Sequence, residues 1–308
     1  MAPLILKKPK NDNYYKNYIL KCYLLFIIYF TISLNLFNSK IWFHIKKCYQ
    51  SLENPNIRIT HFIITRFLLF MNKTFSEKIY TEDYIKNGIR VMKKYLFPSF
   101  ENQSCKNFTW ILILGDRANI TYVKSLLNFN NSFSYNVLFA KSLKNYIRNS
   151  TKDFDILITT RIDYDDRIYY DAVNDVRKAI NINRPMILYG YNRGVIYSEL
   201  YDKYYNLDTN FKNGTMSIFI SLITVLNKVN DTYTIQDLGN HVNIRKTLLE
   251  KYKSFGIKAI NYEPAIFDNG SPKFVYVRQN YSWYYRINGK NLKRLKEKNF
   301  NLLKFYGK

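Results

Sequence analysis

The sequence predicts an α/β domain with a mixed, mostly parallel sheet flanked by helices, preceded by one N-terminal transmembrane helix. Three observations support this prediction. Short apolar, β-branched runs alternate with amphipathic segments in residues 61–180, which is typical of strands joined by helical crossovers. Acidic residues follow two of these runs, at Asp116 and from Asp163 onward. A long stretch without charged residues occupies positions 22–39.

Length and composition set limits on the class of protein. The chain has 308 residues, of which 47% are hydrophobic, and this excludes disorder as a description of the whole chain. The net charge of +24 would suit nucleic acid, an anionic membrane or a phosphorylated substrate. Lys and Arg are spread along the chain, so we expect no nucleic-acid partner. The three Cys residues form no Cys-x-x-Cys pair, and three His residues are too few for a His-rich zinc site.

The N-terminus predicts a membrane anchor. Residues 1–21 form a basic tail, residues 22–39 a short apolar span, and residues 40–56 a stem before the globular domain at 57–308. The more basic flank precedes the span, so the tail is expected in the cytoplasm and the remainder across the membrane. In a eukaryotic or viral setting the domain would be lumenal, as in the Golgi or endoplasmic reticulum. A buried core helix and a cleaved signal peptide are the alternatives.

The first half of the domain alternates strands and helices. The strand at 61–70 precedes an amphipathic helix in which Ile85, Ile89, Met92 and Leu96 share a face and which Pro98 should stop. The following pattern predicts strands at 110–115, 135–140 and 155–160, with helices at 123–127 and 169–180.

The second half has a different pattern. Two strands at 185–190 and 194–197 are predicted to be joined by the turn 191–194. The other expected elements are a strand or helix at 215–222, a helix at 243–255, strands at 257–262 and 273–278, an aromatic patch at 281–285 and a basic helix at 290–305.

The acidic cluster after the strand at 155–160 is the main functional signal. Asp163, Asp165 and Asp166 lie within four positions, where mutual repulsion disfavours three ionised carboxylates. A divalent cation such as Mg²⁺ or Mn²⁺ would relieve that repulsion, because it prefers oxygen ligands. A solvated Asp-rich turn is the alternative. Ligands of parallel sheets bind beyond the carboxyl ends of the strands, where Asp116 also lies, and this favours the metal site.

Four stretches occur in an order that resembles a known family. They are HFIITRFLLF, LFPSFENQ, FTWILILGD and TTRIDYDDRIYYDAV. Their order is similar to that of the rhamnosyltransferase family, which belongs to the nucleotide-sugar glycosyltransferases of the GT-A fold. The resemblance spans about residues 59–285, and Thr-Arg-x-Asp-x-Asp-Asp is its most specific element. Two features depart from the family: Phe67-Leu68 replaces the common Phe-Asn, and the membrane segment is unusual for bacterial members.

The resemblance implies a metal ion that bridges the Asp-x-Asp pair and the diphosphate of a nucleotide-sugar donor. Asp163 and Asp165 would be ribose or metal ligands, with Asp166 accepting hydrogen bonds nearby. Arg161 would contact a phosphate or hold the Asp cluster, and Arg66 and Asp116 would contact the nucleotide from neighbouring strand ends. For each of these, a turn or a surface salt bridge is the alternative role.

A second candidate site lies at Gln236–Asn243. Asp237 follows the acidic cluster at a distance similar to that of the catalytic acid in many GT-A enzymes, and would act as general base in an inverting reaction. His241 would be a late metal ligand or contact the acceptor. As alternatives, Asp237 caps a helix and His241 is an ordinary polar residue.

The leading hypothesis is a membrane-anchored, metal-dependent glycosyltransferase that moves a sugar, with rhamnose among the candidates, to a hydroxyl of a glycan or similar acceptor. A metal-dependent nuclease or other phosphoryl-processing enzyme is the alternative. A non-catalytic sugar-binding membrane protein of the same fold is a third hypothesis.

Overall fold

The computed structural model divides the chain into two compact units, Met1–Gln50 and Ser51–Lys308. It describes residues 57–69, 77–127, 132–191, 193–208, 219–238, 244–254, 265–267, 272–278 and 298–307. The predicted tail, membrane span and stem at 1–21, 22–39 and 40–56 lie outside these residues. None of the helices in the described ranges is long and apolar enough to cross a membrane.

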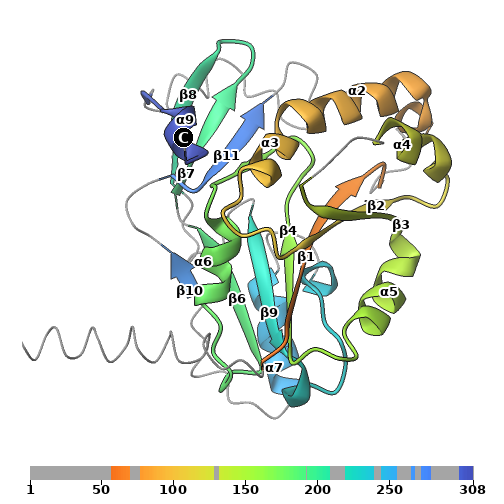
Figure 1. Cartoon of the computed structure of the whole chain (residues 1–308), viewed down its shortest axis with the longest axis vertical. Helices are drawn as coiled ribbons and strands as arrows, with labels where there is room; N and C mark the ends of the chain where they lie inside the picture. The colour runs from red at the N-terminus through yellow and green to blue at the C-terminus, as the bar shows by residue number, and fades with distance from the viewer. Residues whose placement is uncertain are drawn as a thin grey trace, which may run out of the picture. The chain divides into compact units, whose positions relative to one another are not determined.

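A seven-stranded mixed sheet forms the centre of the second unit (Figure 1). Its four consecutive parallel strands confirm the predicted mostly parallel sheet, and β9 runs antiparallel to both of its neighbours. In spatial order the strands are β10 (Ala265–Phe267), β6 (Met186–Tyr191), β9 (Ile220–Val225), β4 (Ile156–Arg161), β1 (Ile59–Phe67), β2 (Thr109–Leu114) and β3 (Ser134–Phe139).

A second sheet of four strands lies beside the first. It contains β5 (Arg167–Ile168), β11 (Phe274–Arg278), β7 (Arg193–Ser198) and β8 (Lys203–Asp208). The predicted hairpin of 185–190 with 194–197 is wrong, because β6 belongs to the first sheet and β7 pairs with β8. The side chain of Tyr191 is buried and its hydroxyl donates to Asp175, so this residue continues the first sheet instead of starting a turn.

Helices cover both faces of the seven-stranded sheet (Figure 1). One face packs against α2 (Glu82–Lys94), α3 (Leu96–Glu101), α4 (Ile120–Leu126) and α6 (Ala172–Lys178). The opposite face packs against α5 (Leu143–Ser150), the 3-10 turn η6 (Ile235–Leu238) and α7 (Ile244–Ser254). The shorter turn η2 (Lys78–Tyr80) leads into α2.

The helix predicted around Ile85–Leu96 does not stop at Pro98. Instead α2 ends at Lys94, and α3 begins at Leu96 with Pro98 as its third residue. A proline is tolerated there because the first turn of a helix does not use its backbone N–H groups. Tyr95, at the break, is completely buried.

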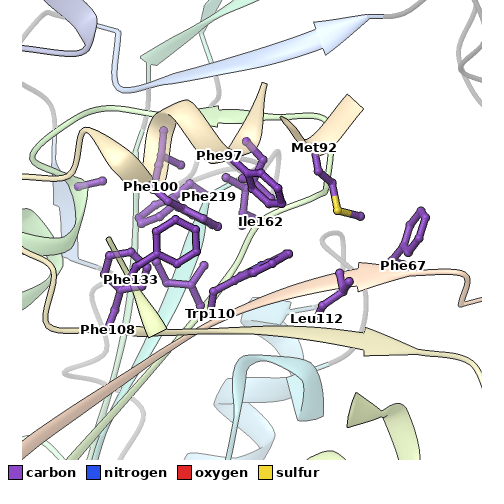
Figure 2. Packing of buried hydrophobic residues seen from close by; sticks show 14 of the residues in the cluster. Phe67, Met92, Phe97, Phe100, Phe108, Trp110, Leu112, Phe133, Ile162 and Phe219 are labelled. Carbon is purple, nitrogen blue, oxygen red and sulfur yellow. The ribbon is translucent and has the colours of Figure 1, made fainter. Parts of the chain in front are cut away.

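Aromatic side chains fill the space between α3 and the sheet (Figure 2). Phe97 and Phe100 of α3 meet Trp110 of β2 with ring centroids 5.3 and 5.9 Å apart, and Phe108 stacks on Phe133 at 5.8 Å. The indole N–H of Trp110 donates to the Thr65 hydroxyl at 2.9 Å, so its one polar atom is paired inside the core. This core fixes β1 and β2 beneath α2 and α3.

The remaining predictions had mixed outcomes. The stretch predicted as strand or helix at 215–222 contributes to strand β9, and helix α7 confirms most of 243–255. The C-terminal helix is shorter than predicted, since 298–301 is not helical and α9 spans Leu302–Phe305. The predicted strand at 257–262 and the aromatic patch at 281–285 lie outside the described residues. Among the α-helices and strands of the described residues, α5, β5, β8 and β10 had not been predicted.

Candidate functional site

The candidate site lies where the parallel strands β1, β2 and β4 end. These strands share a register in which Ile64 lies opposite Arg161, and Arg66 lies opposite Ile113. Residues that follow the last pairs therefore meet at one edge of the sheet. This edge carries Arg66 on β1, Asp116 after β2 and the Asp163–Asp166 loop after β4, as the sequence predicts.

Asp163 lies between two guanidinium groups. Its Oδ1 is 3.8 Å from Arg66 Nη2 and 3.9 Å from Arg161 Nε. Both distances exceed hydrogen-bonding range, so the attraction is mainly coulombic. The Arg161 side chain is 2% exposed, whereas those of Arg66 and Asp163 are 28% and 34% exposed. Positive charge from two strands is thus held beside a carboxylate that still reaches solvent.

The acidic loop does not present all three carboxylates in the same way. Asp163 and Asp165 are half-buried, whereas Asp166 is buried and its Oδ1 accepts a hydrogen bond from the Val277 backbone N–H at 3.2 Å. The backbone N–H of Asp166 bonds to the carbonyl of Asp163 at 3.3 Å, which closes a tight turn. Asp166 therefore joins the loop to β11.

No three His, Cys, Asp or Glu side chains come together as a metal-binding group within the described ranges. The predicted joint metal site of Asp163, Asp165 and Asp166 stays a prediction, and Asp166 differs from the other two because one of its oxygens is bonded to the second sheet. Asp163 and Asp165 are two hard oxygen donors on one turn. This donor set fits a divalent cation that takes its other ligands from phosphate and water.

The ends of β1 and β2 approach each other closely. A Cβ atom on Gly115 would lie 2.6 Å from the Leu68 carbonyl oxygen, so only glycine fits there. Leu68 has a φ of 55°, a left-handed conformation that Asn and Gly adopt more readily than Leu. An Asn, which the resemblance leads us to expect at this position, would adopt this conformation more readily than Leu68 does. Asp116 follows Gly115, with its carboxylate 3.5 Å from Lys141 Nζ and a side chain 57% exposed.

Asp237 makes a local capping arrangement. Its Oδ2 accepts hydrogen bonds from the Thr234 backbone N–H at 2.7 Å and from the Thr234 hydroxyl at 2.9 Å. These bonds belong to η6, in which Asp237 itself lies, and not to the following helix α7, so the cap that the sequence offered as the alternative stays a prediction. The next residue, Ile235, donates its N–H to the Thr159 hydroxyl of β4 at 2.8 Å. His241 lies outside the described residues.

A buried polar chain crosses the sheet and had not been predicted. His61 Nε2 is 2.7 Å from the Thr160 hydroxyl, which in turn is 2.7 Å from the Ser221 hydroxyl. Burial and, to a smaller extent, the charge of Arg177 lower the pKa of His61 to about 3, so the imidazole is neutral at physiological pH. The only sequence signal was a polar residue within the apolar run of β1.

The sheet order and the charged side chains gathered at its carboxyl edge define an α/β protein whose candidate site lies at the end of the parallel strands. Residues 71–235, more than half of the chain, match the family described as "Putative rhamnosyl transferase". The chain belongs to this family of glycosyltransferases. No curated protein matches the sequence.

Solved structures show only a distant likeness. The TarS 1-349 fragment from S. aureus in complex with UDP has 12% identity and a TM-score of 0.39, over 71% of this chain and 60% of that one. The inositol-1-phosphate CTP transferase from T. maritima has 9% identity and a TM-score of 0.33, over 78% of this chain and 97% of that one. The match thus spans less than two thirds of the TarS fragment, and likenesses this low carry no argument about function.

Proposed function

We propose that the chain transfers a sugar, with rhamnose as the first candidate, from a nucleoside-diphosphate donor to a hydroxyl of a glycan or similar acceptor. The donor would bind at the carboxyl edge of β1, β2 and β4. The observation that carries this proposal is the position of Asp163 between Arg66 and Arg161. Family membership supports glycosyl transfer over the alternative of a nuclease or other phosphoryl-processing enzyme.

The charges at this edge suit a diphosphate. A nucleoside diphosphate that leaves the sugar gains negative charge, and fixed positive groups stabilise that charge in the transition state. Arg66 is partly exposed and offers a guanidinium to a phosphate, while the buried Arg161 holds Asp163 in place. Asp116, exposed after β2, would accept hydrogen bonds from the nucleoside.

Asp163 and Asp165 would hold a Mg²⁺ or Mn²⁺ ion at the same edge. When bound, such an ion neutralises part of the charge on the diphosphate oxygens. Asp166 would hold the acidic loop against β11 through its bond to Val277. His241 stays a candidate ligand from the sequence alone.

Asp237 is our candidate for the group that takes the proton of the acceptor hydroxyl in an inverting reaction. One of its oxygens is occupied by two hydrogen bonds from Thr234, and the carboxylate is exposed.

The membrane segment at 22–39 and the cytoplasmic position of the N-terminus also remain proposals, supported by the sequence. A single-pass anchor of this kind would place the transferase at a membrane surface.

The direct test of the activity is a screen of the purified full-length chain, with Mn²⁺ present, for hydrolysis of a panel of sugar nucleotides. Glycosyltransferases of this kind are expected to release nucleoside diphosphate slowly to water when no acceptor is present. We expect one donor to be cleaved above the rest. Cleavage of nucleic acid without cleavage of any sugar nucleotide would select the phosphoryl-processing alternative, and binding without turnover would select a non-catalytic sugar-binding protein.

A further inference from the structure

Ser99 and Gln103 are buried polar residues in the stretch LFPSFENQ, residues 96–103. Ser99 lies in helix α3, and Gln103 lies two residues after the end of that helix. The helix packs against β5, the short strand that begins directly after Asp166. Buried polar groups are nearly always hydrogen-bonded, so the partners of these two side chains indicate what the stretch holds in place.

Ser99 bonds to the backbone of β5. This strand has only two residues and is an edge strand of the second sheet among the described residues. Neighbouring N–H groups of a strand point in opposite directions. The Tyr169 N–H, directly after β5, donates to the Lys273 carbonyl beside β11 at 3.0 Å, whereas the Ile168 N–H donates to Ser99 Oγ at 3.2 Å. The serine therefore supplies, two residues after Asp166, the bond that a further strand would otherwise make.

Gln103 bonds to the chain that follows β5. Its Nε2 donates to the Tyr169 carbonyl at 2.8 Å and to the Ser99 carbonyl at 3.0 Å, and its Oε1 accepts from the Val173 N–H at 3.1 Å. Val173 lies in the first turn of α6, where an N–H has no partner within the helix. A side-chain amide can donate twice and accept at the same time. Gln103 thus joins the end of α3 to both ends of the segment 169–173.

The acidic loop is therefore held on both sides. Before the loop, β4 is paired with β1 and β9 in the middle of the first sheet. After the loop, Asp166 Oδ1 accepts from the Val277 N–H at 3.2 Å, and Ile168 is bonded to Ser99. Asp163 and Asp165 lie between these two fixed points.

We propose that Ser99 and Gln103 are positioning residues that fix the chain after the acidic loop, so that Asp163 and Asp165 are in place before a metal ion and a diphosphate bind. The inference rests on the proposed function and adds the residues that order its metal ligands. A loop that is ordered in advance binds more tightly, because less conformational freedom is lost on binding. A merely structural role would lower the stability of the fold and leave the affinity of the folded protein unchanged.

The first test removes the Ser99 hydroxyl from the full-length chain. Ser99→Ala changes the side chain by one oxygen atom and takes away the partner of the Ile168 N–H. Asn102→Ala is the matched control, because Asn102 also bonds to the backbone from this stretch, but its Nδ2 donates to the Pro98 carbonyl of α3 itself at 2.6 Å. The second variant is Gln103→Met, which keeps a side chain of similar length without its amide.

Three quantities are measured for each protein. Calorimetry gives the Kd of UDP and of dTDP at a fixed Mn²⁺ concentration, and the Mn²⁺ concentration at which nucleotide binding is half-maximal. Urea unfolding gives the stability, and binding is measured under conditions in which each protein is folded. The Mn²⁺ requirement reports on the acidic loop, because Asp163 and Asp165 are the proposed metal ligands.

We expect Ser99→Ala to raise the Kd of the preferred nucleotide about three- to tenfold, as the loss of one hydrogen bond would, and to raise the Mn²⁺ requirement as well. Gln103→Met should raise both at least as much, because it loses more bonds to the same segment. Asn102→Ala should keep the wild-type Kd and Mn²⁺ requirement, even where urea unfolds it earlier.

Three results would overturn the inference: a wild-type Kd in Ser99→Ala or Gln103→Met, a raised Kd with an unchanged Mn²⁺ requirement, or an equal loss of affinity in Asn102→Ala. Each leaves the proposed function intact, provided that wild type binds one of the nucleotides. If wild type binds neither, the proposed function fails and the inference fails with it.

Discussion

At the scale of single residues, Asp163 distinguishes the candidate site from an ordinary acidic turn. Solvated turns rich in Asp need no cationic neighbours, yet here two guanidinium groups from different strands lie within 4 Å of one oxygen. Asp166 has a structural role instead, because it is buried and its bond to the Val277 backbone N–H attaches the acidic loop to β11. Two carboxylates of one motif thus differ: Asp163 reaches solvent between two guanidinium groups, and Asp166 is buried and bonded to the second sheet.

His61 provides a prediction about pH. Its pKa is about 3 in the folded chain and about 6.5 in the unfolded chain, so between these values only the unfolded state binds the proton. The free energy of unfolding should therefore fall as the pH drops from 6.5 toward 3, with full stability above 6.5. Relative to His61→Gln, we expect an extra slope of up to about 1.4 kcal/mol per pH unit.

The measurement is urea unfolding of both proteins at pH 8, 6 and 5. Glutamine can keep the bond to Thr160 and does not titrate, so it isolates the proton-linked part of the stability. Parallel stability curves for the two proteins down to pH 5 would contradict a buried neutral imidazole.

The residue types of the site could be predicted from the sequence, but their partners could not. Arg66, Asp116, Arg161 and Asp163 are at neighbouring strand ends as expected. The contact of Tyr164 with Phe67 and the pairing of Asp166 with β11 join residues that lie far apart in the sequence, and local patterns do not encode such contacts.

At the scale of secondary-structure elements, the end of β1 stores strain. A leucine with a φ of 55° costs about 1 kcal/mol relative to a glycine in the same conformation. The side chain of Leu68 is only 5% exposed and belongs to the core, and the burial of this side chain offsets the cost of the backbone conformation. Its backbone carbonyl is also held by Tyr80.

Because of this strain, the glycine variant at position 68 should be more stable than the alanine variant, which is the reverse of the usual order. Leu68→Ala and Leu68→Gly lose the same kind of core contact, but only glycine relieves the backbone. We expect Leu68→Gly to be more stable than Leu68→Ala by about 1 kcal/mol in denaturant unfolding. At Leu114, a fully buried residue at the end of β2, the order should be the usual one, with alanine more stable than glycine. Alanine ahead of glycine at both positions would contradict the strain at Leu68.

Elements with strong local periodicity were predicted well, and those determined by distant pairing were not. β1, β2, β3 and β4 were found from apolar runs within a few residues of their ends. The hairpin of β6 and β7 was predicted from the turn residues between them, yet burial of Tyr191 keeps β6 in the first sheet. Helix α5 escaped prediction because its buried face rests on only Leu143 and Ile147.

At the scale of the whole molecule, a buried ion pair joins α6 to the start of β11 in the second sheet. Lys273 Nζ lies 3.5 Å from Asp175 Oδ2, and both side chains are at most 4% exposed. Burial raises the pKa of Asp175 and lowers that of Lys273, while the attraction of each for the other opposes these shifts. Tyr191 adds a hydrogen bond to the same carboxylate from β6, so the group connects both sheets.

The proposed anchor gives a prediction for the full chain. Replacing Leu25 and Ile28 with lysine places two charges inside the apolar stretch 22–39, and each charge is costly in a bilayer. We expect the double variant to move from the membrane pellet to the supernatant after carbonate extraction. Carbonate-resistant pelleting equal to that of wild type would exclude this segment as the anchor.

The central claim is that the edge formed by β1, β2 and β4 binds a nucleoside diphosphate through Asp163, Asp165 and a divalent cation. Asp165→Asn removes one charge at this edge, and Asp153→Asn is the matched control, because Asp153 is an exposed carboxylate just before the opposite end of β4. The most direct measurement is calorimetric titration of UDP and dTDP into wild type, with Mn²⁺ or with EDTA, and into both variants with Mn²⁺. We expect wild type and Asp153→Asn to bind one nucleotide with the same Kd, and Asp165→Asn or EDTA to weaken binding at least about tenfold. Equal affinity in EDTA, or an unchanged Kd in Asp165→Asn, would contradict the claim.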